Sequence, residues 1–203
     1  MASGNSAPGV DESSGGLVRH LDGIARCWWC GDDPLYVAYH DDEWARPVHD
    51  DQRLFEKICL EGFQSGLSWL TILRKRDNFR RAFADFMPSA VEKFGEPDIA
   101  RLVADAGIIR HRGKIESVIN NARRYADLVA EYGSLDAFVW GFAPGDATTP
   151  RTKSQIAAST PESTALSREL KRRGWSFVGP TTMYAFMQSV GVVNDHLVGC
   201  SAR

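Results

Sequence analysis

The sequence predicts an all-α fold. Three observations support this prediction: apolar residues recur at helical spacing, prolines stand where a first helical turn accepts them, and glycines follow where the periodic segments stop. No segment shows the strict apolar and polar alternation of a half-buried strand, and no internal repeat is present. With 203 residues and 43% hydrophobic content, the chain is long enough to bury a substantial core.

The chain begins with a segment unlike the rest. Residues 1–22 are rich in Gly, Ser and acidic side chains and poor in aromatic residues, which predicts a disordered tail. Residues 23–203 are expected to form a single helical domain. Its first long helix can be capped by Asp50 or Asp51 and runs through Leu60.

Later helices are predicted from the same signals. They are expected at 67–73, from Pro88, from Pro97 over 98–106 with Gly107 as its stop, over 114–132, from Pro161 to Gly174, and from Pro180 to Gly191. The 114–132 segment carries an apolar stripe at helical spacing: Ile115, Val118, Ile119, Ala122, Tyr125 and Val129. Residues 143–158 read as a Pro/Thr/Ser-rich loop.

Two of these helices form a candidate DNA clamp over about 98–132. A short connector, 107–113, is bounded by glycines and contains Arg110 and Arg112, with Lys114 directly after it. Such a turn can direct backbone N–H groups and a helix N-terminus at a phosphate. A plain connector between two helices is the alternative, because the commoner Leu-Pro-Gly-x-Gly form is absent.

Charge is divided unequally along the chain. Residues 1–61 carry 5 basic and 12 acidic side chains, a net charge of −7, whereas residues 62–203 carry 19 and 14, a net charge of +5. Several basic clusters in one part of a chain suggest a phosphate-binding surface, although each alone is typical of a solvated helix face.

No apolar run approaches the roughly 20 residues of a membrane span. Without a secretory signal or a disulfide framework, a cytoplasmic location is expected.

Zinc-type ligands stand at both ends of the chain. Cys27 and His40 lie near the start, and His196 and Cys200 are four residues apart near the end, on one helical face. Two thiolates and two imidazoles suit a closed tetrahedral zinc that would join the two ends. From spacing alone, Cys30 competes with His40 as a ligand, and the CWWC run at 27–30 also fits a redox pair, although it lacks the βαβ setting of that motif.

Aromatic residues gather around one acidic side chain. Trp28, Trp29, Tyr36, Tyr39, Trp44 and Trp69 accompany Glu61 within 28–69. Most aromatic side chains serve packing, but Glu61 directly follows the apolar Ile58-Cys59-Leu60 and therefore needs a partner or a function. A positively charged alkylated purine would be such a partner, since aromatic faces attract its charge and a carboxylate accepts its N–H.

The sequence resembles the bacterial DNA-3-methyladenine glycosylase I family from about residue 26 to the end. The resemblance is carried by the ungapped strings RC (26–27), DPLYVAYHD (33–41), EW (43–44), LFEKICLEG (54–62), GLSW (66–69), DAGIIRHRGKI (105–115) and VNDHLVGC (193–200). It implies an all-α helix-hairpin-helix DNA glycosylase fold with a zinc site joining the N- and C-terminal segments.

The resemblance also assigns roles to residues. It implies a structural zinc on Cys27, His40, His196 and Cys200, which selects His40 over Cys30. It implies a base pocket of Glu61, Tyr39 and Trp69 surrounded by Trp29, Tyr36 and Trp44, and a loop, Gly66-Leu67, that approaches the gap left by an extruded base. DNA contacts are expected at Arg110, Arg112, Gly113 and Lys114.

The implied activity is hydrolytic release of 3-methyladenine from alkylated double-stranded DNA, leaving an abasic site, with Glu61 as the key carboxylate. Asp127 and Asp136 are further carboxylates by type, with no reason to choose either. No lysine in the hairpin or its second helix is clearly set up for Schiff-base chemistry, so a monofunctional enzyme is expected. Action as a monomer is the default expectation. A zinc deaminase is disfavoured because its H-x-E and P-C-x-x-C patterns are missing. A non-catalytic DNA-binding module would not need the pocket.

Overall fold

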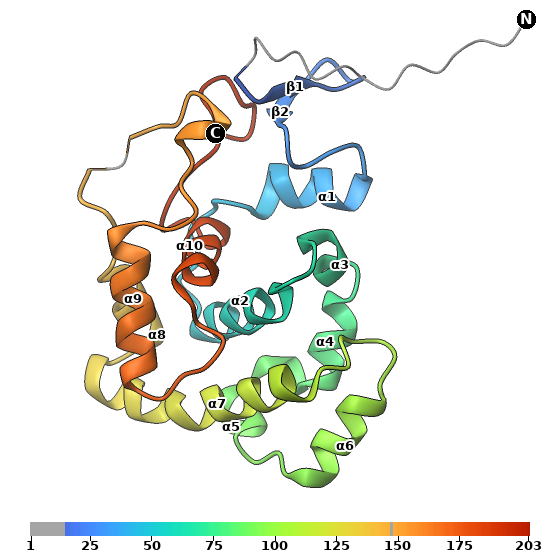
Figure 1. The fold of residues 1–203 in the computed structure, drawn as a ribbon, viewed down its shortest axis with the longest axis vertical. Helices are drawn as coiled ribbons and strands as arrows, with labels where there is room; N and C mark the ends of the chain where they lie inside the picture. Colours follow the sequence, from blue (N-terminus) through green and yellow to red (C-terminus); the bar gives the residue numbers. More distant parts are fainter. Residues whose placement is uncertain (1–14, 147) are drawn as a thin grey trace, which may run out of the picture.

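The computed structural model describes residues 15–146 and 148–203 (Figure 1). Its elements, in chain order, are β1 (Leu17–Arg19), β2 (Ala25–Cys27), α1 (Pro34–Ala38), a π-helical turn η2 (Tyr39–Glu43), α2 (Asp51–Gln64), α3 (Trp69–Leu73), α4 (Arg76–Ala82), a 3-10 turn η3 (Ala84–Phe86), α5 (Pro88–Val91), α6 (Glu96–Ala104), α7 (Arg112–Tyr132), α8 (Leu135–Trp140), a 3-10 turn η4 (Lys153–Gln155), α9 (Pro161–Arg172) and α10 (Pro180–Ser189). The described chain is mostly helical, as predicted.

A small antiparallel hairpin corrects the predicted tail. β1 pairs with β2 in the register Leu17↔Cys27, and the backbone N–H of Ser201 donates to the carbonyl of Ala25 at 2.9 Å. Residues 17–22 therefore do not belong to a disordered tail, and the expectation for residues 1–14 lies outside the described residues. Strands of three residues are too short for a recognisable alternation of apolar and polar side chains, so these two strands could not be predicted from the sequence.

Helix α2 forms the centre of the core. The Asp50 side chain caps it by accepting from the N–H of Arg53 at 2.8 Å, and every residue from Leu54 to Phe63 is buried. A helix that is buried all round must be covered on several sides. Here α10, α3, α7 and α8 pack against α2 (Figure 1), so Glu56, Lys57 and Glu61 of α2 lie in the protein interior.

The remaining predicted helices are confirmed with small shifts at their ends. Helix α9 begins at Pro161 and α10 at Pro180, each with the proline in the first turn. The loop joining α6 to α7 spans residues 105–111, and His111 caps α7 by accepting the N–H of Lys114 at 3.2 Å. The predicted stripe of α7 faces inward through its buried members Ile115, Val118, Ile119 and Ala122.

The first and last described segments lie together. Figure 1 shows the β1–β2 hairpin beside the C-terminal segment at one end of the molecule. Within residues 15–146 and 148–203, no helix has both the length and the apolar composition that crossing a membrane requires.

Candidate functional site

Four buried ligand-type side chains meet where the two ends of the chain come together. Cys27, His40, His196 and Cys200 each direct one ligand atom into a cluster whose atoms all lie within 4.8 Å of one another. Cys200 Sγ lies 3.4 Å from both His40 Nε2 and His196 Nδ1, and Cys27 Sγ lies 3.8 Å from His196 Nδ1. The predicted ligand set is therefore brought together by the fold.

The distances suit a tetrahedral zinc ion. Zn–S bonds of about 2.3 Å and Zn–N bonds of about 2.0–2.1 Å separate sulfur and nitrogen ligands by about 3.5–3.6 Å in tetrahedral geometry, and the observed separations bracket that value. A hydrogen bond between the two thiols lowers the pKa of Cys200 and raises that of Cys27. Cys30 lies outside the cluster, with its Sγ 3.7 Å from His20 Nε2.

Each histidine is oriented through its second ring nitrogen. His40 Nδ1 lies 2.7 Å from an oxygen of Asp41, and the guanidinium of Arg26 donates to the same carboxylate at 2.8–3.0 Å. His196 Nε2 lies 3.2 Å from the carbonyl oxygen of Trp44. With those nitrogens protonated, the unprotonated nitrogen of each ring faces the cluster, which is the tautomer that a metal ligand needs.

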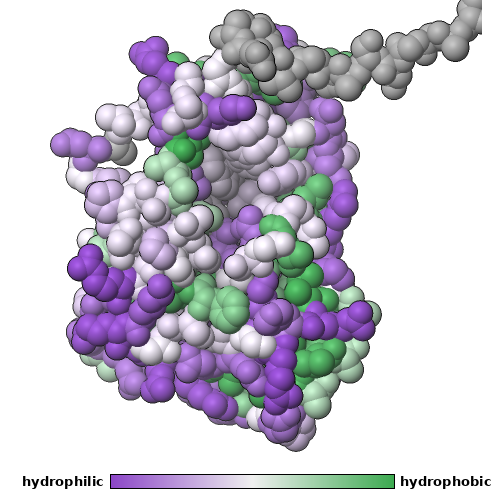
Figure 2. Space-filling view, in the orientation of Figure 1, coloured by the Kyte–Doolittle hydropathy of each residue, from purple (hydrophilic) through white to green (hydrophobic). Residues whose placement is uncertain are grey.

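A second site, an aromatic cavity of about 210 Å³, lies next to this cluster. It is lined by Trp28, Trp29, Tyr36, Tyr39, Trp44, Glu61, Gln64, Trp69, Ile156, Ala185 and Gln188. The face drawn in Figure 2 is hollowed in its upper half, in the region between α1 and α10. Drug-sized ligands occupy cavities of roughly 300–1,000 Å³, so this one suits a smaller, flat group such as one nucleobase.

All six predicted pocket residues line this cavity, together with others that the sequence did not single out. Gln64 comes from the end of α2, and Ala185 and Gln188 come from α10, more than a hundred residues later. Two amide side chains thus add hydrogen-bonding capacity to an aromatic wall. Neither Asp127 nor Asp136 lines the cavity; Asp136 instead pairs with His49 at 2.8 Å.

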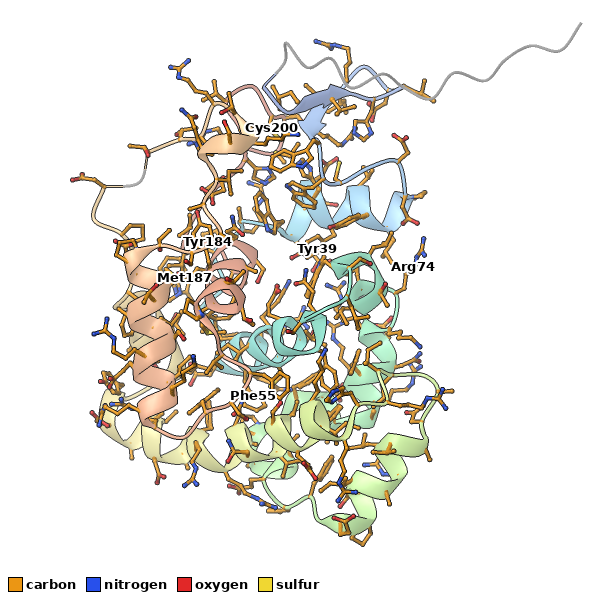
Figure 3. All side chains as sticks on the ribbon, viewed as in Figure 1. Tyr39, Phe55, Arg74, Tyr184, Met187 and Cys200 are labelled. Atoms are coloured by element: carbon orange, nitrogen blue, oxygen red, sulfur yellow. The ribbon has the colours of Figure 1, made fainter. Side chains whose placement is uncertain are left out.

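The Cys/His cluster and the cavity share a wall. Tyr39 and His40 are neighbours in the turn η2, and both are buried; Tyr39 lines the cavity whereas His40 enters the cluster. The ring of Trp29 lies 5.0 Å from that of His40, and the ring of Trp44 lies 4.7 Å from that of His196. Figure 3 shows Tyr39 near the middle of the molecule and Cys200 towards the hairpin. Ordering of the cluster therefore supports one side of the cavity.

Glu61 is the acidic residue among those that line the cavity. Its side chain is only 4% exposed, and burial raises its pKa to about 8, opposed by the charge of Lys57 and by hydrogen bonding with Ser189. The indole N–H of Trp69 is buried and has no hydrogen-bond partner among the described residues. The cavity wall thus contains a carboxyl group, and one of its indoles, Trp69, has an N–H without a partner among the described residues.

The loop after α2 carries an exposed apolar side chain. Gly66 has a φ of +80°, which favours glycine, and Leu67 beside it is 40% exposed. Lys114 Nζ donates to the carbonyl oxygens of Phe63 at 2.9 Å and Ser65 at 2.5 Å. Lys114, which the sequence predicts to contact DNA, is buried in this structure, and its ammonium holds this loop.

The cations in and next to the loop between α6 and α7 differ in their surroundings. Arg112 is half exposed and pairs with Glu96 and Glu116 at 2.7 and 2.8 Å. Arg110 is exposed and forms no ion pair with a described residue. Gly113 lies in the first turn of α7. Of the three predicted cations, Arg110 is thus the one with its charge freely available to an anion.

Comparison with known proteins identifies the family. Residues 29–203 match the methyladenine glycosylase family. The chain belongs to this family. It is 52% identical over 179 residues to DNA-3-methyladenine glycosylase 1 of Escherichia coli strain K12, covering 87% of this chain and 96% of that protein. The family is one of glycosylases, and the chain is accordingly an enzyme of the hydrolase class.

Solved structures of the family share the fold. A crystal structure of 3-methyladenine DNA glycosylase I superposes with a TM-score of 0.84 at 49% identity, covering 87% of this chain and 98% of that one. A variant of 3-methyladenine DNA glycosylase I in complex with 3-methyladenine gives a TM-score of 0.81 at 35% identity, covering 84% of this chain and 93% of that one. The helical architecture is therefore that of the family throughout the matched region.

Proposed function

We propose that the chain releases 3-methyladenine from alkylated double-stranded DNA by hydrolysis and leaves an abasic site. The observation that carries this proposal is Glu61, a buried carboxylate in the wall of an aromatic cavity of nucleobase size. Further support comes from a relative at 52% identity that is named DNA-3-methyladenine glycosylase 1 and from a structural neighbour described in complex with 3-methyladenine.

The lesion supplies much of its own activation. Methylation at N3 leaves the adenine in DNA positively charged, so the base departs as a neutral purine without a strong general acid. The rings of Tyr39 and Trp69 lie 5.4 Å apart at the cavity wall and attract the cationic base. Glu61 accepts an N–H of the base, and Tyr39 adds a second polar contact. Selectivity for the methylated base then comes from how readily it flips out of the duplex and how well it fits the cavity.

Hydrolysis by water fits the side chains around the cavity. No lysine lines the cavity within the described part of the chain, so the wall offers no amine to trap the sugar as a Schiff base. Glu61, once ionised, also opposes the positive charge that develops on the sugar as the bond breaks. We propose a monofunctional glycosylase on these grounds.

DNA engagement is assigned to the face formed by the 65–68 loop and the N-terminus of α7. We propose that residues 98–132 act as a helix-hairpin-helix clamp, in which the backbone at Gly113 and the side chains of Arg110 and Arg112 approach phosphates. Leu67, exposed beside Gly66, would fill the gap left by the extruded base. Lys114 contributes indirectly by fixing the loop.

Zinc is proposed as a structural ion. Cys27, His40, His196 and Cys200 would hold it with four protein ligands, which leaves no open position for an activated water. Its contribution would be to tie the hairpin to the C-terminal segment and thereby order the cavity wall next to Tyr39. We further propose that the enzyme acts as a monomer in the cytoplasm, in keeping with four cysteines that are all free thiols.

The test is base release from methylated duplex DNA by the wild type and by Glu61→Gln. The substitution keeps the shape but removes the negative charge, and we expect a loss of roughly a hundredfold or more in the single-turnover rate, as for removal of one preorganised charge-stabilising group. Glu56→Gln is the control, because Glu56 is buried on the same helix and pairs with Arg53 and Arg80 outside the cavity. Wild-type release by Glu61→Gln would refute the assignment.

A further inference from the structure

Lys57 is a buried charge with no assigned role. It lies one helical turn before Glu61 on α2, its side chain is 7% exposed, and its Nζ has no hydrogen-bond partner among the described residues. An ammonium group carries three donors, and burying it without acceptors costs several kcal/mol. Such a cost in the middle of the central helix calls for a functional explanation.

The ammonium lies against two rings of the cavity. Lys57 Nζ is 4.8 Å from the centre of the Tyr39 ring and 5.6 Å from that of the Trp69 ring. Both rings line the cavity, whereas Lys57 is not among the lining residues. Lys57 can therefore influence an occupant of the cavity only through these rings and through Glu61.

The carboxylates near Lys57 differ in whether an arginine already forms an ion pair with them. Glu43, from η2, receives two hydrogen bonds from Arg76, at 2.5 and 2.9 Å. Glu56 on α2 is paired with arginines at both of its oxygens. Glu61 has no arginine partner among the described residues.

The groups facing Glu61 leave Lys57 as its counter-charge. Ser189 of α10 lies near Glu61 but donates its hydroxyl hydrogen to the Phe186 carbonyl at 2.9 Å, and the phenols of Tyr36 and Tyr39 add no positive charge. Residues four apart on a helix lie on the same side of it. Among the charged groups around Glu61, Lys57 is therefore the cation that no arginine-paired carboxylate already neutralises.

We propose that Lys57 is a positioning residue that makes ionisation of Glu61 easier, so that at a given pH more of the carboxylate can accept the N–H of the extruded base. The proposal rests on the proposed function, since it assigns Lys57 to the same base-recognition site. The charge interaction supports it from both sides: burial lowers the pKa of Lys57 to about 8, and the negative charges of Glu43 and Glu61 oppose that loss of positive charge. Burial favours a neutral Glu61, and the ammonium opposes that tendency.

The direct test is the titration of Glu61, followed by ¹³C NMR of carboxyl-labelled glutamate between pH 5 and 10. The resonance of Glu61 is assigned by its absence in Glu61→Gln. In Lys57→Met we expect Glu61 to titrate at clearly higher pH than in the wild type, and in Lys57→Arg to titrate close to the wild type. Lys114→Met is the matched control: it removes another buried ammonium, one that contacts the 63–65 carbonyls, and should leave the titration of Glu61 unchanged. An unchanged titration of Glu61 in Lys57→Met would overturn the proposal, whether or not the protein releases a base.

Base release gives the functional readout. Lys57→Met should lose about tenfold or more of the single-turnover rate at pH 7 and recover towards wild type as the pH rises. In a Glu61→Gln background the same substitution should have no further effect, because Lys57 acts through Glu61. Additive losses that persist at high pH would indicate a merely structural lysine. Absence of base release by the wild type would instead contradict the proposed function and leave the NMR result to decide the role of Lys57.

Discussion

The carboxylate of Asp41 should control how tightly the cluster holds its metal. It accepts a hydrogen bond from the Nδ1–H of His40 at 2.7 Å and is itself fixed by three hydrogen bonds from Arg26. In Asp41→Asn the amide cannot supply the same negative charge, so His40 becomes a weaker and less uniquely oriented ligand. Loss of such a partner usually lowers metal affinity 10- to 100-fold, which corresponds to about 1.4–2.7 kcal/mol.

The assay is zinc competition against a chromophoric chelator, with thermal unfolding of the zinc-free and zinc-loaded protein measured alongside. Zinc-free unfolding separates the cost of leaving Arg26 with Asp22 as its remaining partner from the loss of metal affinity. Asp42→Asn is the control, because Asp42 is the exposed neighbour in the same turn. Wild-type zinc affinity in Asp41→Asn would show that the cluster does not use His40 as a ligand in the orientation described.

Three further results are expected. Cys200→Ser should lose tightly bound zinc in elemental analysis and also weaken base release, because the cluster supports the cavity wall through His40 and Trp29; full retention of zinc would contradict the ligand assignment. Leu67→Ala should reduce release from duplex DNA about tenfold or more while leaving the affinity for free 3-methyladenine, followed by tryptophan fluorescence, unchanged; an equal loss in both assays would argue against a role in filling the DNA gap. Burial raises the folded-state pKa of Glu61 from 4.5 to about 8, so its contribution to stability is present below pH 4.5 and is lost as the pH rises to about 8. The melting temperature of Glu61→Gln relative to wild type should therefore be higher at pH 8 than at pH 5, and a pH-independent difference would refute the shift.

Much of the helical fold could be predicted because its signals are local. Pro161 and Pro180 begin helices in their first turns, and Asp50 caps α2 as its side chain allows. The inward position of Glu61 followed from the apolar residues directly before it. In each case the signal and the structure lie within a few residues of one another, where propensity and periodicity are informative.

The features that sequence reasoning missed depend on contacts between distant segments. Strand β1 pairs with β2, and β2 in turn bonds to the C-terminal segment through Ser201 and Ala25. Lys114 was assigned to a phosphate by its basic neighbours, yet packing of α7 against the end of α2 directs it to the Phe63 and Ser65 carbonyls.

Lys57 shows the same limitation within the core. A lysine in a helix ordinarily suggests a solvated face, and only the coverage of α2 on several sides reveals it as a buried charge beside Glu61. Gln188 was likewise not predicted, because it lines the cavity only through the packing of α10 on α2. Such residues can be found from a structure, where burial and neighbours are explicit, but not from local pattern alone.

The most direct measurement is chromatographic identification of the bases that the purified wild-type protein releases from methylated duplex DNA. The account predicts free 3-methyladenine with little 7-methylguanine, and intact strands that break only when abasic sites are cleaved by alkali. Salt-sensitive binding to the duplex without any released base would contradict it and leave a non-catalytic DNA-binding member of the family.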